Sequence, residues 1–174
     1  MISQLFFLPL ARRTFHVALT AALLVVARPV MAQSGEGIAI GTTAPAVTVA
    51  DASGRTVRVA PTIGRPMLIE FWATWCPNCK ELEPALIEAA RKYGAKVKFI
   101  GVAVSVNENP ARVKAFVAKH GLLGDQYFDT HGDASGAYDA PATSYVVVID
   151  KTGKVVYTGL GGKQDLEAAI KKVL

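Results

Sequence analysis

The sequence predicts an α/β protein with a mixed central sheet, helices on both faces of that sheet and an N-terminal β-hairpin extension. Short apolar runs alternate with amphipathic helical segments through the middle of the chain. Two further β-rich runs precede this alternating part, and a terminal hairpin and helix follow it. A hydrophobic fraction of 51% and a charged fraction of 19% are typical of a globular protein with a sizeable core.

The N-terminal elements are predicted from their residue types. The β-rich runs 47–49 and 56–59 flank an Asp-Ala-Ser-Gly sequence at 51–54, a pattern typical of a hairpin. The strongly apolar run 67–72 predicts a buried strand. A helix is expected to begin near Pro77 and to end at Gly94, because proline is favoured at the first helical position and glycine just beyond a helix.

The later elements follow the same signals. The run 97–104 predicts a second buried strand, and Asn109-Pro110 opens a helix over 111–120 that Gly121 closes. The remaining expected elements are a short strand at 126–128, a helical turn at 134–138, a strand at 145–149, its antiparallel partner at 154–158 and a final amphipathic helix at 164–173.

The first 32 residues are predicted to be a signal peptide. Arg12 and Arg13 form a basic region, an almost wholly apolar run follows from 15 to 27, and Val-Met-Ala at 30–32 fits a cleavage site. The apolar run is shorter than the ~20 residues of a membrane-spanning helix. An uncleaved membrane anchor is the alternative. Residues 33–40 are expected to be a flexible lead-in, and residues 41–174 a single domain.

Charge argues against a nucleic-acid partner. The formal net charge is +5, but residues 1–32 hold three of the 19 basic residues and none of the 14 acidic ones. The rest of the chain is therefore close to neutral, with 16 basic residues against 14 acidic ones. It has no basic run interleaved with aromatic residues and no nucleic-acid-binding motif.

The two cysteines, Cys76 and Cys79, are the residues that point to chemistry. They lie where the buried strand passes into the helix, and unpaired N–H groups at a helix start favour a thiolate. A thiolate at Cys76 can attack a substrate disulfide, and Cys79, one turn along, can release the product. A disulfide between them would close a very small loop and so would stabilise the fold little. The close spacing therefore indicates a redox-active pair and not a structural disulfide.

Zinc is a weak alternative for this pair. A zinc site usually needs four ligands, and beyond the two thiols only His120 and His131 remain after residue 32, without metal-like spacing. We therefore expect neither a metal nor any other cofactor.

The stretch 71–80 reads Phe-Trp-Ala-Thr-Trp-Cys-Pro-Asn-Cys-Lys. It resembles the active-site segment of thioredoxins, and specifically of the exported TlpA/ResA-like branch. Gly-Thr-Thr-Ala-Pro at 41–45 and Ile-Asp-Lys-Thr-Gly-Lys-Val-Val at 149–156 resemble the branch's lead-in and terminal hairpin. The resemblance covers roughly residues 41–174. It implies a thioredoxin fold, a redox disulfide between Cys76 and Cys79, and reduction of disulfides in exported proteins, often apocytochromes awaiting haem.

The resemblance also assigns roles outside the dithiol. Glu70 matches the buried carboxylate of thioredoxins, which exchanges a proton near neutrality; the alternative is that Glu70 points outward from an edge. Trp75 and Pro77 are expected at the substrate surface. The cis-proline of the family falls at Ser144, after Thr143, in a gapless count, and Pro141 fills that role only if the chain is shifted.

Two further positions depart from the family pattern. A glutamate that commonly follows the second cysteine by three residues is Leu82 here, with Glu81 and Glu83 on either side. A thioredoxin lysine near the buried acid falls at Gly101.

The sequence therefore predicts an exported thiol–disulfide oxidoreductase, acting as a reductant in the periplasm or another extracytoplasmic compartment. Its partners are expected to be protein thiols and disulfides, with a membrane electron donor possible in addition. Two alternatives stay open: a copper-binding module of the same fold and a thiol peroxidase. The sequence around Cys76 leaves the direction of electron flow open, because reduction potentials in this fold span on the order of −120 to −270 mV.

Overall fold

The computed structural model describes residues 37–174, and the expected signal peptide lies outside them. The elements in chain order are β1 (Val47–Ala50), β2 (Thr56–Val59), β3 (Met67–Trp72), α1 (Pro77–Tyr93), β4 (Lys98–Val104), α2 (Pro110–His120), β5 (Asp125–Asp129), α3 (Asp133–Ala137), β6 (Tyr145–Ile149), β7 (Val155–Leu160) and α4 (Leu166–Lys171).

The strands form one seven-stranded mixed sheet in the order β2-β1-β5-β4-β3-β6-β7. Strands β3, β4 and β5 are parallel, whereas β6 pairs antiparallel with β3, and β7 pairs antiparallel with β6. The strands β1 and β2 pair antiparallel, and β1 joins the sheet through β5 at Ala50 and Phe128. This arrangement makes β3 a central strand, buried along its whole length.

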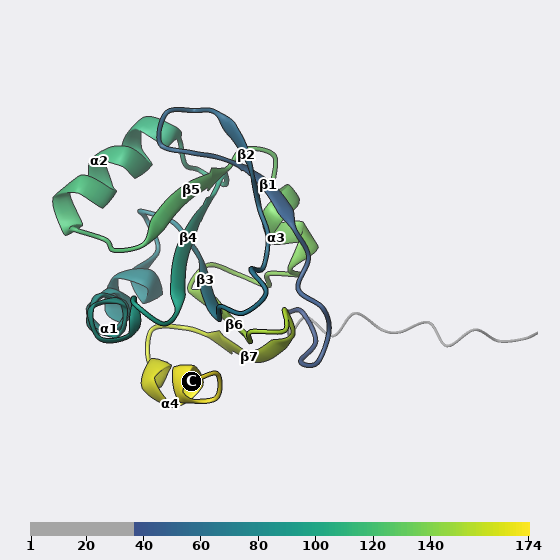
Figure 1. Ribbon diagram of the computed structural model, residues 1–174. Coiled ribbons are helices and arrows are strands. Elements are labelled where there is room, and N and C mark those ends of the chain that lie inside the picture. Colours follow the sequence, from purple (N-terminus) through teal and green to yellow (C-terminus); the bar gives the residue numbers. More distant parts are fainter. Residues whose placement is uncertain (1–36) are drawn as a thin grey trace, which may run out of the picture. The chain divides into compact units, whose positions relative to one another are not determined.

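Helices cover both faces of the sheet (Figure 1). Helices α1 and α4 pack on one face, where Leu82 and Ile170 share an apolar cluster with Leu68 and Val148. Helix α2 covers the same face further along, because its Phe116 contacts Trp72. Helix α3 covers the opposite face, where Tyr138 packs against Phe71.

Hydrogen bonds fix the starts of the two longer helices. Cys76 caps α1 in an extended conformation, and Pro77 follows at the first helical position. The side chain of Asn109 caps α2 by accepting a hydrogen bond from Arg112 N at 2.9 Å, and Gly121 ends it in the left-handed conformation (φ 65°). The predicted limits of both helices are confirmed to within one residue.

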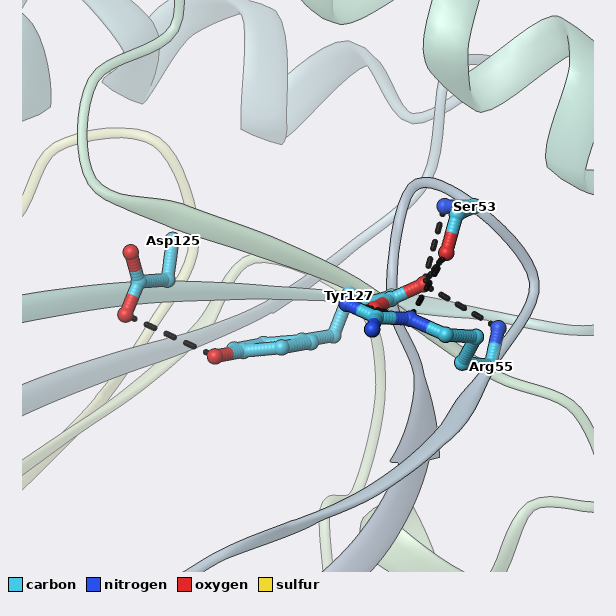
Figure 2. A network of polar contacts seen from close by, with 5 residues as sticks. Ser53, Arg55, Asp125 and Tyr127 are labelled. Atoms are coloured by element: carbon cyan, nitrogen blue, oxygen red, sulfur yellow. Dashed lines mark hydrogen bonds and ion pairs between the residues drawn. The ribbon is translucent and has the colours of Figure 1, made fainter.

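The turn between β1 and β2 is organised by one carboxylate. Asp51 Oδ1 accepts hydrogen bonds from Ser53 N at 2.9 Å and Arg55 N at 3.1 Å, and Asp51 Oδ2 accepts one from Arg55 Nε at 3.0 Å. A hydrogen bond from the Ser53 hydroxyl to Oδ1 at 2.6 Å, together with these three, holds the pKa of Asp51 well below its usual range. Figure 2 shows Ser53 and Arg55 at this turn, beside Tyr127 and Asp125 of the neighbouring strand β5.

The described end of the expected lead-in packs on the domain. Ile38 is buried, and its N–H donates to the Tyr138 carbonyl at 3.1 Å and to the Tyr145 hydroxyl at 3.0 Å. Gly41 N then donates to the Val155 carbonyl at 2.8 Å. Residues 38–41 are therefore attached to the domain on the α3 side of the sheet.

Candidate active site

The dithiol lies at the junction of β3 and α1. Cys76 and Cys79 form a disulfide, with their Cα atoms 5.3 Å apart. The backbone N–H of Cys79 donates a hydrogen bond to Cys76 Sγ at 3.0 Å. This N–H is one of the donors that a helix start leaves without an intrahelical partner. In the reduced protein, the same donor and the helix dipole would stabilise a thiolate on Cys76 rather than on Cys79.

The disulfide is shielded, but the side chains on either side of Cys76 are open to solvent. Cys76 is 2% exposed and Cys79 6%, whereas Trp75 is 43% exposed and Pro77 is also exposed. The Trp75 indole donates a hydrogen bond to the Val106 carbonyl at 2.9 Å. The loop before α2 therefore fixes the orientation of Trp75 beside the dithiol.

Glu108 ties the same loop to the active-site segment. Its side chain is shielded from solvent, and its carboxylate accepts a hydrogen bond from Thr74 N at 2.8 Å. Arg112 pairs with the other carboxylate oxygen at 3.4 Å. The sequence analysis missed this residue, because no local pattern links Glu108 to a strand end 34 residues earlier.

Glu70 is buried in the central strand and does not point outward from an edge. Burial, with a smaller contribution from the Glu83 carboxylate, raises the pKa of Glu70 to about 8. Glu70 and Cys79 line one small cavity of about 20 Å³, together with Trp72, Lys80 and Glu83 among others. The buried carboxyl and the second cysteine thus face a common space.

Two of the residues that line this cavity carry unpartnered polar atoms. Among the described residues, three buried side-chain atoms lack a hydrogen-bond partner: Glu70 Oε1, Trp72 Nε1 and Gln126 Oε1. Glu70 and Trp72 both line the cavity, and their unpartnered atoms are an acceptor and a donor. A volume of about 20 Å³ is enough for one water molecule, and a buried water needs two to four polar partners.

Gly101 lies beside Glu70, at the position of the family lysine. The register pairs Glu70 with Gly101 on β4, and Gly101 with Gln126 on β5. The Gln126 Oε1 atom occupies the space that a side chain at Gly101 would need. The neutral amide of Gln126 therefore fills the space beside Glu70, at the position that the sequence analysis matched to the thioredoxin lysine.

Glu83, not the residue at the family's glutamate position, faces the dithiol. Leu82 is fully buried in the apolar cluster between α1 and α4. Glu83 lies one helical turn after Cys79 and lines the cavity with it. Its Oε1 lies 3.0 Å from His120 Nδ1, and the His120 ring stacks on Phe116 with a centroid distance of 3.8 Å.

Ser144 lies at the same end of the sheet as the dithiol. Its N–H donates to the Phe71 carbonyl at 2.8 Å, and its Oγ to the Gly161 carbonyl at 3.1 Å. Its own carbonyl accepts hydrogen bonds from Gly161 N and Gln164 Nε2, each at 3.0 Å. Ser144 is fully buried with a φ of 64°, a strained value for a residue other than glycine.

The three residues before Ser144 are less enclosed. Residues 37–174 contain no cis peptide bond, so the bond between Thr143 and Ser144 is trans. Thr143 is half-buried and Pro141 is exposed. Ser144 directly precedes β6, which supports the gapless count over the shifted alternative with Pro141.

Known proteins match most of the described chain. The Redoxin family model covers residues 39–174. The thiol–disulfide oxidoreductase ResA of Bacillus thuringiensis (strain Al Hakam) is 32% identical over 140 residues, which span 79% of this chain and 80% of ResA. The chain belongs to the Redoxin family. Within that family it is a ResA-like thiol–disulfide oxidoreductase with a thioredoxin fold.

A second relative and a solved structure are also similar to this chain. ResA of Bacillus subtilis (strain 168) is 29% identical over 121 residues, covering 70% of this chain and 67% of that protein. The thioredoxin domain of a thiol–disulfide oxidoreductase from Bacteroides vulgatus superposes with a TM-score of 0.68. It is 22% identical and covers 79% of this chain and 99% of that one, which supports the fold.

In the described part of the chain, none of the helices has the length and apolar character needed to cross a membrane. No group of three or more His, Cys, Asp or Glu side chains gathers there in a way that could hold a metal ion.

Proposed function

We propose that this protein is exported and reduces disulfides in other exported proteins through Cys76 and Cys79. The observation that carries the proposed dithiol chemistry is the hydrogen bond from Cys79 N–H to Cys76 Sγ at the start of α1. It favours Cys76 as the attacking thiolate. The ResA relatives, which are named thiol–disulfide oxidoreductases, support the same activity.

The exchange runs in two steps. The Cys76 thiolate attacks one sulfur of a substrate disulfide, forms a mixed disulfide and releases the other sulfur as a thiolate that takes up a proton. Cys79 then loses its proton and attacks Cys76 Sγ, which releases the second substrate thiol. The substrate gains two electrons, and the Cys76–Cys79 disulfide forms. A separate electron donor, which we place at the membrane, must then reduce this disulfide.

Glu70 is proposed as the acceptor of the Cys79 proton. Both side chains line the small cavity, whose volume suits one water molecule. Such a water would accept a hydrogen bond from Trp72 Nε1 and donate one to Glu70 Oε1, which satisfies both unpartnered atoms. It would also give the Cys79 proton a path to the carboxylate. General-base assistance of this kind contributes roughly 10²–10⁴-fold at most.

The proposed substrate surface consists of Trp75, Pro77 and Thr143. Trp75 and Pro77 are the exposed neighbours of Cys76. Thr143 is the proposed backbone contact, because the N–H, carbonyl and hydroxyl groups of Ser144 all have partners within the protein. Ser144 would then shape the loop without pairing with the substrate, and Pro141 would lie outside the contact.

The proposed compartment is the periplasm or another extracytoplasmic space. The predicted signal peptide at 1–32 and the likeness to ResA support export. N-terminal sequencing of the mature protein tests this: a start at Gln33 is expected after cleavage, and an intact leader on membrane-bound protein would support the anchor instead.

Trapping of mixed disulfides tests the activity and the assignment of the two thiols. Cys79→Ser should accumulate mixed disulfides with substrate proteins through Cys76, because the second step is blocked. Cys76→Ser should trap none. If Cys76→Ser traps substrates as well as Cys79→Ser does, the assignment is wrong. Two further assays test the alternative functions. A copper-binding module would bind copper tightly in a titration of the reduced protein. A thiol peroxidase would turn over peroxide rapidly in a peroxide-consumption assay.

A further inference from the structure

The small cavity at the dithiol has a polar connection to the surface. Cys79 and Glu83 lie one turn apart on α1, and Phe116 and His120 lie one turn apart on α2. Where the helices meet, Glu83 Oε1 is 3.0 Å from His120 Nδ1. The side chain of Glu83 is 18% exposed and that of His120 is 29% exposed.

The His120 ring is held in a fixed orientation. It stacks almost parallel on Phe116, with 3.8 Å between ring centroids and 9° between ring planes. Phe116 in turn packs against Trp72, with a centroid distance of 5.5 Å. Trp72 and Phe116 both line the cavity. The same aromatic contacts that close the cavity therefore direct Nδ1 of His120 towards Glu83.

We propose that Glu83 and His120 form the path by which Glu70 exchanges its proton with solvent, and that His120 relays the proton at the outer end of that path. This inference rests on the proposed role of Glu70. It also assigns a role to Glu83, the acidic residue that faces the dithiol. The family's own glutamate position is occupied by Leu82.

The path is needed because Glu70 cannot act as a base while it holds a proton. With a pKa of about 8, most Glu70 carboxyls are protonated at pH 7. Glu70 is only 8% exposed, so direct exchange with bulk water is restricted. The groups that face the cavity are Glu70 from β3, Cys79, Lys80 and Glu83 from α1, and His120 behind Glu83 from α2.

The proposed transfer moves a single proton and no electrons. Protonated Glu70 gives its proton to the Glu83 carboxylate across the cavity that both residues line, and Glu83 passes it to Nδ1 of His120 across the 3.0 Å contact. The resulting imidazolium releases its Nε2 proton to solvent. Glu70 is then a carboxylate and can accept the proton of Cys79 during the second exchange step.

The test measures the rate at which Cys79 resolves a preformed mixed disulfide between Cys76 and a small thiol, in single turnovers from pH 5 to 9. His120→Phe retains an aromatic ring against Phe116 but removes the proton-accepting nitrogens. Glu83→Gln removes the carboxylate. His131→Gln is the matched control, because His131 lies in an exposed loop. Glu70→Gln provides the reference for loss of the base.

Each variant has a defined expected result. His120→Phe and Glu83→Gln should each slow resolution at pH 7 by about threefold to tenfold, less than the full effect of a general base. The deficit should shrink towards pH 9, and free imidazole in the buffer should restore the rate of His120→Phe. The double variant should be no slower than either single variant, and His131→Gln should resolve at the wild-type rate.

The outcomes separate this inference from the proposed function. If Glu70→Gln is slow while His120→Phe resolves at the wild-type rate, the inference is overturned and the role of Glu70 stands. If His120→Phe is slow but imidazole does not restore it, His120 acts through packing alone and the inference is also wrong. If Glu70→Gln itself resolves at the wild-type rate, Glu70 is not the base and the proposed mechanism fails.

Discussion

At the scale of single residues, the site depends on a carboxyl group that the fold keeps out of water. Glu70 lies on a fully buried strand, and its Oε1 atom has no hydrogen-bond partner in the protein. Burial of such a group without compensation is costly, and more so when the group is ionised. Glu70 therefore lowers the stability of the folded protein, which is typical of a functional residue rather than a structural one.

The pH dependence of stability tests the state of Glu70. Its pKa is 4.5 ordinarily and about 8 in the folded protein, so between these values the folded protein holds a proton that the unfolded chain has released. The free energy of unfolding should therefore fall as the pH rises through this window. The total fall is on the order of several kcal/mol, at about 1.4 kcal/mol per pH unit.

Glu70→Gln should remove this fall, because the amide does not ionise. In denaturant titrations, the variant should resemble the wild type near pH 4 and be the more stable protein at pH 9. Glu88→Gln is the matched control, since Glu88 is an exposed residue of α1. Equal stability of wild type and Glu70→Gln at pH 9 would show that Glu70 has no raised pKa.

At the scale of elements, side-chain hydrogen bonds fix where secondary structure turns and starts. The Asp51 carboxylate organises the turn between β1 and β2, and the Asn109 side chain caps α2. The cap also affects the site, because α2 supplies Phe116 and His120. The loop immediately before the cap supplies the Val106 carbonyl and the Glu108 carboxylate that hold Trp75 and Thr74.

Loss of the α2 cap should therefore weaken the protein by a predictable amount. Asn109→Ala removes the acceptor for Arg112 N–H and should lower the free energy of unfolding by about 1 kcal/mol. Asn109→Ser is the matched control, because serine caps helices about as well as asparagine and should restore most of that loss. Both are measured by denaturant unfolding. An alanine variant as stable as the wild type would mean that the cap contributes nothing.

At the scale of the whole molecule, much of the fold could be predicted from local sequence signals. Pro77 and Gly94 mark α1, and Asn109 and Gly121 mark α2, so both helices lie within one residue of the expected limits. The attachment of the first hairpin to β5 could not be predicted. It depends on a single pairing between Ala50 and Phe128, which only the assembled sheet creates.

Some residues of the candidate site could likewise be predicted from the sequence, and others could not. Glu70, Cys76 and Cys79 fall within ten consecutive residues, so the motif and its resemblance to thioredoxins point to them directly. The pair of Glu83 with His120 spans 37 residues and exists only because α2 packs beside α1. The conformation of Ser144 likewise depends on partners at Phe71 and Gly161, which no local pattern connects.

The central claim is that Cys76 attacks the substrate disulfide and that Cys79 resolves the mixed disulfide, with its proton passing to Glu70. The alkylation rates of the two thiols test the assignment of these two steps most directly. In the fully reduced protein, each cysteine is alkylated over a range of pH and quantified by mass spectrometry. The account predicts that Cys76 reacts with a pKa below the ordinary thiol value of about 8.5, and Cys79 with a pKa at or above it. A lower pKa and faster alkylation at Cys79 than at Cys76 would contradict the account.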